Sequence, residues 1–379
     1  MVSVGETLAA VPLIKALRQQ HPETLLVITT TTPTGSERVT SLFASEIADK
    51  KILHVYAPYD IPCALGNFLD RIKPKLAIVM ETELWPNMIH ACALRSIPVV
   101  IANARLSEKS AKGYARVAGL SRAMMNEIAV VAAQNSRDGL RFVDMGLGKE
   151  KLRVTGSIKF DLVLSAEIHA RAAELKRAWS NNNQRLVFLA ASTHPGEDEI
   201  ILRVFKKCKE QRPGLLLVLV PRHPERFNSI YQLCVKSGFK TVRRSETQNT
   251  TLPSSQHDVD IVLGDTMGEL LVFYGACDIA FVGGSLVPVG GHNLIEPAAW
   301  ALPILCGKHL FNFSDVAEVL QQQQALLVCE TETVLYDRVA GLLQEPAKRK
   351  DMGIAAQRTA NENRGALQRL LTEINFFLE

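Results

Sequence analysis

The stretch Phe281-Val-Gly-Gly-Ser-Leu-Val-Pro-Val-Gly-Gly-His-Asn-Leu-Ile-Glu-Pro297 indicates the fold of this chain most directly. It begins at the end of an apolar strand, continues as a glycine-rich loop, and ends in a helix predicted to start at His292. The first N–H groups of a helix, together with its dipole, attract a phosphate. Glu296 lies four residues after His292, on the same predicted face, where it could accept hydrogen bonds from a ribose. The stretch therefore indicates a nucleotide site, although a glycine-rich turn with a capped helix would show the same pattern.

Length and composition indicate a soluble protein of two domains. The chain has 379 residues, of which 47% are hydrophobic and 22% are charged, which is ordinary for globular domains with a real core. The net charge of +4 permits an acidic ligand or an anionic membrane surface without requiring either. No concentrated basic stripe indicates nucleic-acid binding.

The seven cysteines are widely spaced and include no CxxC pair. This spacing predicts neither a zinc site nor a disulfide framework, and indicates reduced thiols in a cytoplasmic protein. No apolar run approaches the roughly 20 residues of a membrane span, and no signal peptide is predicted before Ser3.

Apolar strands alternate with helices along the whole chain. This order predicts parallel sheets covered on both faces, with ligands bound at the carboxyl ends of the strands. A polar turn that follows a charged helix separates the chain into a domain of residues 1–175 and a domain of residues 176–379. The last predicted helix, 347–377, is a candidate to pack back on the N-terminal domain, and residues 246–257 form a predicted solvated loop.

Polar motifs of the first domain fall at the predicted carboxyl ends of strands. Glu6 opens the first helix, either as a general base or as a carboxylate stabilised by the helix dipole. Glu81 and Glu83 flank Thr82 directly after a buried strand, so that strand alternation predicts only one of the two facing a ligand. Lys159 is a natural partner for an anionic substrate.

Three motifs of the second domain follow strands and open predicted helices or turns. In Ala191-Ser-Thr-His-Pro-Gly-Glu197, Ser192 or Thr193 is expected to cap a helix. Arg222 and His223 follow the next strand, where arginine fits a phosphate or, alternatively, a surface ion pair. Gly264-Asp-Thr-Met-Gly-Glu269 is expected to open a helix at Met267. No cluster of residues has metal-ligand spacing.

In combination, the polar motifs resemble those of the Kdo (3-deoxy-D-manno-octulosonic acid) transferases of lipopolysaccharide synthesis. The resemblance extends from Ser3 to the final helix. The motifs that carry it are Ser3-Val-Gly-Glu6, Thr32-Pro-Thr-Gly-Ser-Glu-Arg38, Glu81-Thr-Glu-Leu-Trp-Pro86, Ala102-Asn-Ala-Arg105, Gly156-Ser-Ile-Lys-Phe160, Ser192-Thr-His-Pro-Gly-Glu197, Pro221-Arg-His-Pro-Glu-Arg226, Gly264-Asp-Thr-Met-Gly-Glu269 and the stretch from Gly283 to Pro297.

This resemblance implies a GT-B glycosyltransferase, with two Rossmann-like α/β domains facing a cleft. The family moves Kdo from CMP-Kdo onto the tetraacyl lipid A precursor at the cytoplasmic face of the inner membrane, without a metal or other cofactor. Glu6 then matches the catalytic base and Glu81 the second catalytic carboxylate. The implied substrate-binding residues are Lys159, Arg222, His223, Met267, Gly268, Glu269, Gly291, Asn293 and Glu296.

One departure from the family pattern concerns the start of the chain. The family normally carries a hydrophobic anchor and a first strand before Ser3-Val-Gly-Glu6, whereas here Met1 stands almost directly before that motif. Most of a first strand is therefore expected to be absent, which would affect the placement of Glu6. A GT-B nucleotide-sugar epimerase and a non-catalytic CMP-sugar binding protein are the alternative functions.

Overall fold

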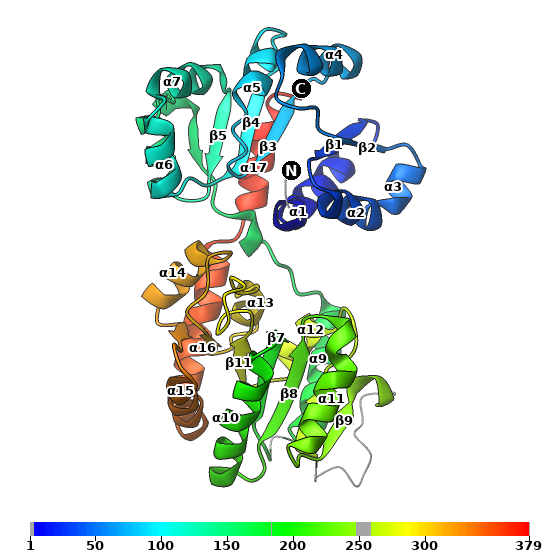
Figure 1. Ribbon diagram of the computed structural model, residues 1–379, viewed down its shortest axis with the longest axis vertical. Coiled ribbons are helices and arrows are strands. Elements are labelled where there is room, and N and C mark those ends of the chain that lie inside the picture. Colours follow the sequence, from blue (N-terminus) through cyan, green and yellow to red (C-terminus); the bar gives the residue numbers. More distant parts are fainter. Residues whose placement is uncertain (1–3, 183, 248–258, 379) are drawn as a thin grey trace. The chain divides into compact units, whose positions relative to one another are not determined.

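The computed structural model describes residues 4–182, 184–247 and 259–378. The chain forms two compact units, of which unit 1 comprises residues 1–161 and 363–379, and unit 2 comprises residues 162–362 (Figure 1). The expected boundary at residue 175 differs from this division. The helix α9 (Ala166–Trp179) packs against α12 (Leu270–Gly275) and so belongs to unit 2.

Unit 1 alternates strands and helices. Its elements are α1 (Val4–Gln20), β1 (Leu26–Thr30), α2 (Pro33–Leu42), α3 (Ala44–Ala48), β2 (Ile52–Tyr56), α4 (Pro62–Ile72), β3 (Ala77–Met80), α5 (Pro86–Ala93), β4 (Val99–Ala104), α6 (Glu108–Ala115), α7 (Ala118–Glu127), β5 (Val130–Ala133), α8 (Ser136–Asp144), η1 (Lys149–Lys151), β6 (Leu152–Val154), η2 (Ile158–Phe160) and α17 (Ala366–Asn375).

The described strands of unit 1 form two parallel sheets, β1–β2 and β3–β4–β5–β6. Successive side chains of the second sheet enter opposite cores, as Val99 and Val100 do in β4. One core is closed by α1 and α17, and the other by α4, α5, α7 and α8. Residues of β1 and β3 also line a shared cavity of about 190 Å³.

The C-terminal helix of the chain packs into the core of unit 1, and Asp161 fixes its start. The Asp161 carboxylate accepts hydrogen bonds from the backbone N–H groups of Gly365 and Leu367, both at 2.5 Å. The prediction of one helix over 347–377 is wrong, because Gly365, at φ +83°, separates α16 (Pro346–Glu362) from α17. The α17 helix lies beside β4 and packs against α1 (Figure 1).

Unit 2 is built on the same alternation. Its further elements are β7 (Val187–Thr193), α10 (Glu197–Gln211), β8 (Leu216–Pro221), η3 (Pro224–Arg226), α11 (Phe227–Lys236), β9 (Thr241–Arg243), η4 (Arg244–Glu246), β10 (Ile261–Leu263), β11 (Ile279–Val282), α13 (Ile295–Ala299), β12 (Ile304–Cys306), α14 (Ser314–Gln322), β13 (Leu326–Val328) and α15 (Glu332–Gln344). Most of the expected loop over 246–257 lies outside the described residues.

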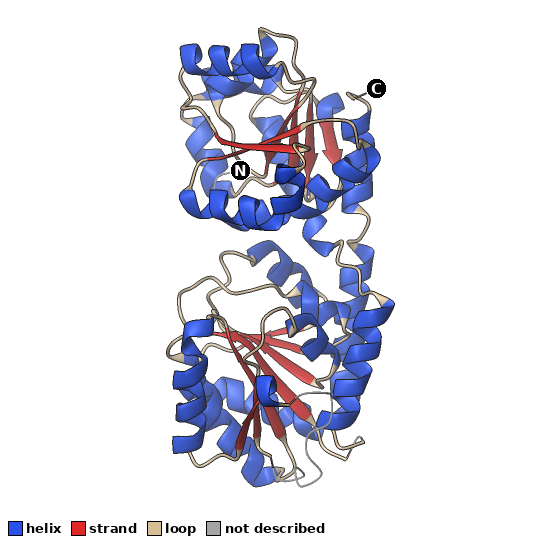
Figure 2. Cartoon of the chain, turned by 90° about the vertical axis from the view of Figure 1, so that its right-hand side faces the viewer, coloured by secondary structure: helices blue, strands red, loops and turns tan. Residues whose placement is uncertain are grey.

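Unit 2 contains a parallel sheet in the order β13–β12–β11–β7–β8–β10–β9. Figure 2 shows the strands of this sheet in red, with helices on either side. In β7, Phe188 and Ala190 enter one core, which α10, α11 and α15 close, whereas Leu189 and Ala191 enter a second core with α9 and α12. Burial on both faces explains why the strands are continuously apolar. The central strand β7 therefore carries Ser192 and Thr193 to the carboxyl edge of a rigid sheet.

Candidate active site

In unit 1, Glu81 is the centre of a buried charge cluster. It follows β3, and its carboxylate contacts Nε of Arg105 at 3.2 Å and Nζ of Lys159 at 3.1 Å. Arg105 follows β4 and Lys159 lies in η2, so the carboxylate joins three segments that are distant in sequence. The two cationic partners offset part of the cost of burying this carboxylate, and removing either one would leave it less compensated. The structure thus brings Glu81 and Lys159 together, and it adds Arg105.

The backbone around this cluster is unusual. Glu81 at φ +55° and Asn103 at φ +52° occupy the left-handed region, which non-glycine residues seldom adopt. The buried Asn103 accepts a hydrogen bond from the backbone N–H of Ile158, at 3.1 Å, through Oδ1. Its amide nitrogen has no hydrogen-bond partner in the described part of the chain. Strained residues and unpaired buried donors are concentrated at functional sites.

The remaining predicted residues of unit 1 take separate positions. Glu83 accepts a hydrogen bond from the indole of Trp85 at 2.9 Å, so that it supports the loop after β3. Glu6 is half-buried in the first turn of α1, and α1 packs against η2, the element that carries Lys159.

In unit 2, the glycine-rich loop is held by Glu197, a residue whose role sequence reasoning missed. The carboxylate is fully buried and accepts four backbone N–H groups. Oε2 accepts from His194 at 2.9 Å and Gly284 at 2.6 Å, whereas Oε1 accepts from Ser285 at 3.0 Å and Leu286 at 2.9 Å. All four are charge-assisted hydrogen bonds.

The backbone amides of the glycine-rich loop bond to other groups of unit 2. The N–H groups of Gly284, Ser285 and Leu286 bind Glu197, and those of Gly290 and Gly291 bind the carbonyl oxygen of Gly284, at 3.1 and 2.7 Å. These amides are therefore used within the protein and do not form an open phosphate cradle. Gly291, at φ +78°, occupies a backbone conformation that residues with a side chain seldom adopt, and a Cβ there would lie 2.9 Å from Cδ2 of Leu310.

Two expected helix starts are wrong, and α10 is not capped as predicted. The helix expected from His292 begins at Ile295, because the Asn293 side chain accepts the Ile295 N–H at 3.0 Å and so forms a turn. The helix expected from Met267 begins at Leu270, after Gly268 at φ +81°. Neither Ser192 nor Thr193 caps α10, where the N-cap is Gly196.

Thr193 instead belongs to a buried polar network. Its hydroxyl donates to the Asp198 carboxylate at 2.6 Å, and Arg226 forms a short ion pair with the same carboxylate. Arg226 also donates to the carbonyl oxygen of Thr193 at 2.8 Å. Burial raises the pKa of Asp198, and the bonds from Thr193 and Arg226 oppose this shift. The network fixes the segment after β8, which carries Arg222 and His223.

Three histidines gather at this edge of unit 2. The Nε2 atoms of His194 and His292 lie 2.8 Å apart and their rings stack, while the ring of His223 lies edge-on to His194, with centroids 5.3 Å apart. Burial, together with the charges of the neighbouring His194 and Arg222, lowers the pKa of His292 to about 4; burial also lowers the pKa of His194. The 2.8 Å contact requires one ring to donate and the other to accept, so at least one ring is neutral.

This histidine pair predicts a loss of stability in mild acid. A histidine with a depressed pKa binds fewer protons when folded than when unfolded, so its contribution to stability is complete above about pH 6.5 and declines toward pH 4. Thermal unfolding between pH 7 and pH 4.5 should show a smaller decline for His292→Gln than for the unmodified chain. His309→Gln, in the same unit, is the control, and equal pH slopes for all three proteins would contradict the assignment.

Glu296 and Arg222 lie next to the histidines. Burial raises the pKa of Glu296, although the hydrogen bond from Asn293, at 3.2 Å, and the positive charge of Arg222 oppose the shift. The Arg222 side chain is exposed and has no ion-pair partner within 4 Å in the described ranges. The structure therefore brings Arg222, His223, Asn293 and Glu296 to one edge of the sheet, with an exposed cation beside a half-buried carboxylate.

The last three predicted residues form a separate group. The Glu269 carboxylate accepts hydrogen bonds from the Arg244 guanidinium at 3.0 and 3.1 Å, from Arg171 at 2.9 Å, and from the Thr266 hydroxyl at 2.5 Å. Although burial acts in the opposite direction, the bonds from Arg244 and Thr266 lower the pKa of Glu269. This carboxylate therefore fixes the exposed loop of Met267 and Gly268.

Comparison with known proteins decides the family. The sequence model described as 3-Deoxy-D-manno-octulosonic-acid transferase (kdotransferase) matches residues 1–162. The chain is 45% identical over 378 residues to a 3-deoxy-D-manno-octulosonic acid transferase of Haemophilus influenzae, covering 100% of this chain and 86% of that protein. The chain belongs to the Kdo transferase family. The same transferase of Bordetella pertussis is 35% identical over 381 residues, covering 100% of this chain and 86% of that protein.

The fold of this Kdo transferase is GT-B. A glycosyltransferase from Rickettsia africae has a similar fold, with a TM-score of 0.61 at 12% sequence identity, over 100% of this chain and 96% of that one. A UDP-N-acetylglucosamine 2-epimerase from Listeria monocytogenes gives a TM-score of 0.58 at 14% identity, over 100% of this chain and 95% of that one. The epimerase shares the fold alone. Within the described ranges, no helix combines the length and apolarity of a membrane span, and no His, Cys, Asp and Glu side chains form a metal-binding group.

Proposed function

We propose that this Kdo transferase moves Kdo from CMP-Kdo to lipid IVA, the tetraacyl precursor of lipid A, at the cytoplasmic face of the bacterial inner membrane. The observation that carries the proposal is the 45% identity to a Kdo transferase along the whole chain. In this proposal unit 1 binds the lipid acceptor and unit 2 binds the donor. No metal or other cofactor takes part.

The chemistry follows from the residues present. Glu6 takes the proton from an acceptor hydroxyl, the oxygen forms a bond to the anomeric carbon of Kdo, and the bond from that carbon to the phosphate oxygen breaks. CMP leaves with the bonding electron pair, and Arg222 and His223 stabilise its phosphate charge. Lys159, beside Glu81, binds the carboxylate of the substrate.

The test is incubation of the chain with CMP-Kdo and lipid IVA, followed by mass measurement of the lipid. The expected result is a lipid heavier by one or more Kdo units, formed equally well with EDTA present. Transfer that stops in EDTA would refute the metal-independent mechanism. Binding of CMP-Kdo without any new lipid would favour a non-catalytic CMP-sugar binding protein, and conversion of the donor sugar alone would favour an epimerase.

Glu296 gives a prediction about donor binding. We propose that its carboxylate, positioned by Asn293, accepts hydrogen bonds from the ribose of CMP. Hydrogen bonds to a charged group contribute about 1.5–3 kcal/mol, so Glu296→Gln should weaken CMP binding roughly tenfold or more, as measured by titration calorimetry. Glu330→Gln, at an exposed glutamate of the same unit, is the control. Equal CMP affinities for both variants would contradict this role.

A further inference from the structure

The corner between α6 and α7 exposes apolar side chains to solvent. Residues 115–120 are all exposed, and they include Val117 at 51% and Leu120 at 54% exposure. The inward face of α7 is occupied by Ser121, Met124 and Met125, so the corner itself stands outside the core. Exposed apolar residues that stand close together often mark an interaction surface.

The helices on either side of this corner are rich in basic residues. Between Ser107 and Arg122 the chain has the four basic residues Lys109, Lys112, Arg116 and Arg122 and one acidic residue, Glu108, which pairs with Lys112 at 2.6 Å. Within the described part of the chain, Lys109, Arg116 and Arg122 have no ion-pair partner within 4 Å. Unpaired cations around exposed apolar residues complement a surface that combines anionic headgroups with hydrocarbon.

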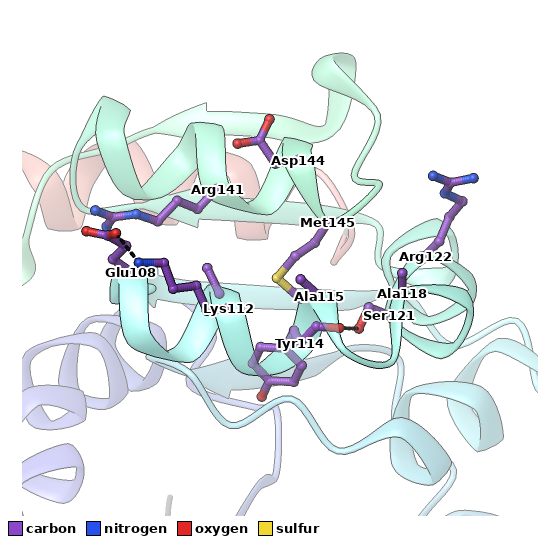
Figure 3. A pocket seen from close by; sticks show the side chains of 11 residues that line it. Glu108, Lys112, Tyr114, Ala115, Ala118, Ser121, Arg122, Arg141, Asp144 and Met145 are labelled. Atoms are coloured by element: carbon purple, nitrogen blue, oxygen red, sulfur yellow. Dashed lines mark hydrogen bonds and ion pairs between the residues drawn. The ribbon is translucent and has the colours of Figure 1, made fainter.

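A hollow adjoins the same corner. A cavity of about 350 Å³ lies between α6, α7 and α8, and its wall includes Ala115, Ala118 and Met145 (Figure 3). Figure 3 shows Lys112 and Arg141 near one end of this cavity and Arg122 at the other. Asp144 and Glu108 also line it, so the wall offers both charged and apolar contacts to an amphiphile.

The corner is connected to the charge cluster of unit 1 through α6. This helix begins three residues after Arg105, the partner of Glu81, and Ser107 caps it through the N–H of Ser110 at 3.1 Å. Tyr114, in the last turn of α6, is close enough to Glu83 for that carboxylate to help raise its pKa, after the larger effect of burial. A lipid bound at the corner would therefore lie at the end of the helix that begins just after Arg105, the partner of Glu81.

We propose that residues 115–122, together with Lys109 of α6, form a membrane-docking surface. In it, Val117 and Leu120 enter the interface of an anionic phospholipid bilayer, and Lys109, Arg116 and Arg122 contact its phosphates. The inference rests on the proposed function in one respect, because a lipid acceptor requires the enzyme to work at a bilayer. Binding to phospholipid alone can be measured without any transfer reaction, so the two proposals can fail separately.

The test is co-sedimentation with vesicles that contain no acceptor. The chain should bind vesicles containing phosphatidylglycerol, should bind pure phosphatidylcholine much less, and should be released by salt. Each basic residue near an anionic surface accounts for about a fivefold change in binding, so Lys109→Gln/Arg116→Gln/Arg122→Gln should bind about a hundredfold more weakly. Val117→Ser/Leu120→Ser should also bind more weakly and should keep its sensitivity to salt.

Matched controls separate this surface from general effects of charge and hydrophobicity. Lys206→Gln/Lys236→Gln/Lys350→Gln makes the same change in net charge on exposed lysines of unit 2, and Leu94→Ser removes an apolar side chain that is 71% exposed. Controls that lose as much binding as the docking variants would overturn the proposal, as would docking variants that bind like the unmodified chain.

An activity measurement distinguishes docking from catalysis. The docking variants should transfer Kdo normally to a detergent-solubilised acceptor and more slowly to an acceptor embedded in vesicles. Equal losses in both assays would overturn the docking role. If the unmodified chain transfers Kdo in neither assay, the proposed function fails while the vesicle-binding result still stands on its own.

Discussion

Replacing Glu6 with glutamine is expected to lower the rate of Kdo transfer by about 10²- to 10⁴-fold, because a positioned general base contributes a factor of that size. Glutamine keeps the length and the hydrogen-bonding shape of the side chain but cannot take a proton at neutral pH. Donor binding should persist, because the donor residues Arg222, Asn293 and Glu296 lie in unit 2. The measurements are single-turnover transfer to lipid IVA and CMP-Kdo affinity on the same protein preparations.

Glu46→Gln is the control for this experiment. Glu46 is also a half-buried glutamate in the first helical turn of a unit 1 helix, and its carboxylate accepts a hydrogen bond from the neighbouring Ser45 at 2.6 Å. The control should keep full activity. Normal turnover in Glu6→Gln would remove Glu6 from the mechanism, and a parallel loss of donor affinity would show that the substitution had altered more than the base.

The architecture followed from the sequence because its strands are buried on both faces. Residues 97–101 and 186–190 are short apolar runs between helical segments, which indicates parallel sheets. The structure places β4 at Val99–Ala104 and β7 at Val187–Thr193. The ends of elements were less predictable. The polar residues Ser192 and Thr193 predict that the strand ends at Ala190, yet β7 continues to Thr193, whose polar groups bond to Asp198 and Arg226 in the buried interior.

The candidate site was predictable in position but not in its partners. Strand order alone places Glu81, Arg222 and Glu296 at carboxyl edges, where ligands bind in α/β proteins. No local pattern, however, indicates that Glu197 binds the amide of Gly284, 87 residues away. The same glycine-rich sequence suits a loop that binds phosphate and a loop that binds a protein carboxylate. Only the tertiary structure distinguishes these two possibilities.

Replacing Glu197 with glutamine is expected to destabilise unit 2 and to weaken donor binding, because it disrupts the hydrogen bonds that hold the glycine-rich loop. Both carboxylate oxygens accept two N–H groups each. An amide would present its NH₂ group to two of those donors, whichever way it is turned, and would leave them unpaired in a fully buried site. At about 1–3 kcal/mol for each unpaired donor, the expected loss is roughly 2–6 kcal/mol. Chemical unfolding and CMP-Kdo titration measure the two effects.

Glu199→Gln is the matched control, since Glu199 lies in the same first turn of α10 and is exposed. It should change stability little, since surface substitutions usually change the free energy of unfolding by less than about 0.5 kcal/mol.

Hydrogen exchange gives a third, local readout. The amides of Gly284, Ser285 and Leu286 should be protected in the unmodified chain and in Glu199→Gln, but should exchange much faster in Glu197→Gln. Because Gly284 also holds Gly290 and Gly291 through its carbonyl oxygen, release of the loop should reach Asn293 and Glu296. Unchanged exchange with weakened CMP-Kdo binding would instead mean that Glu197 acts on the donor and not through the loop.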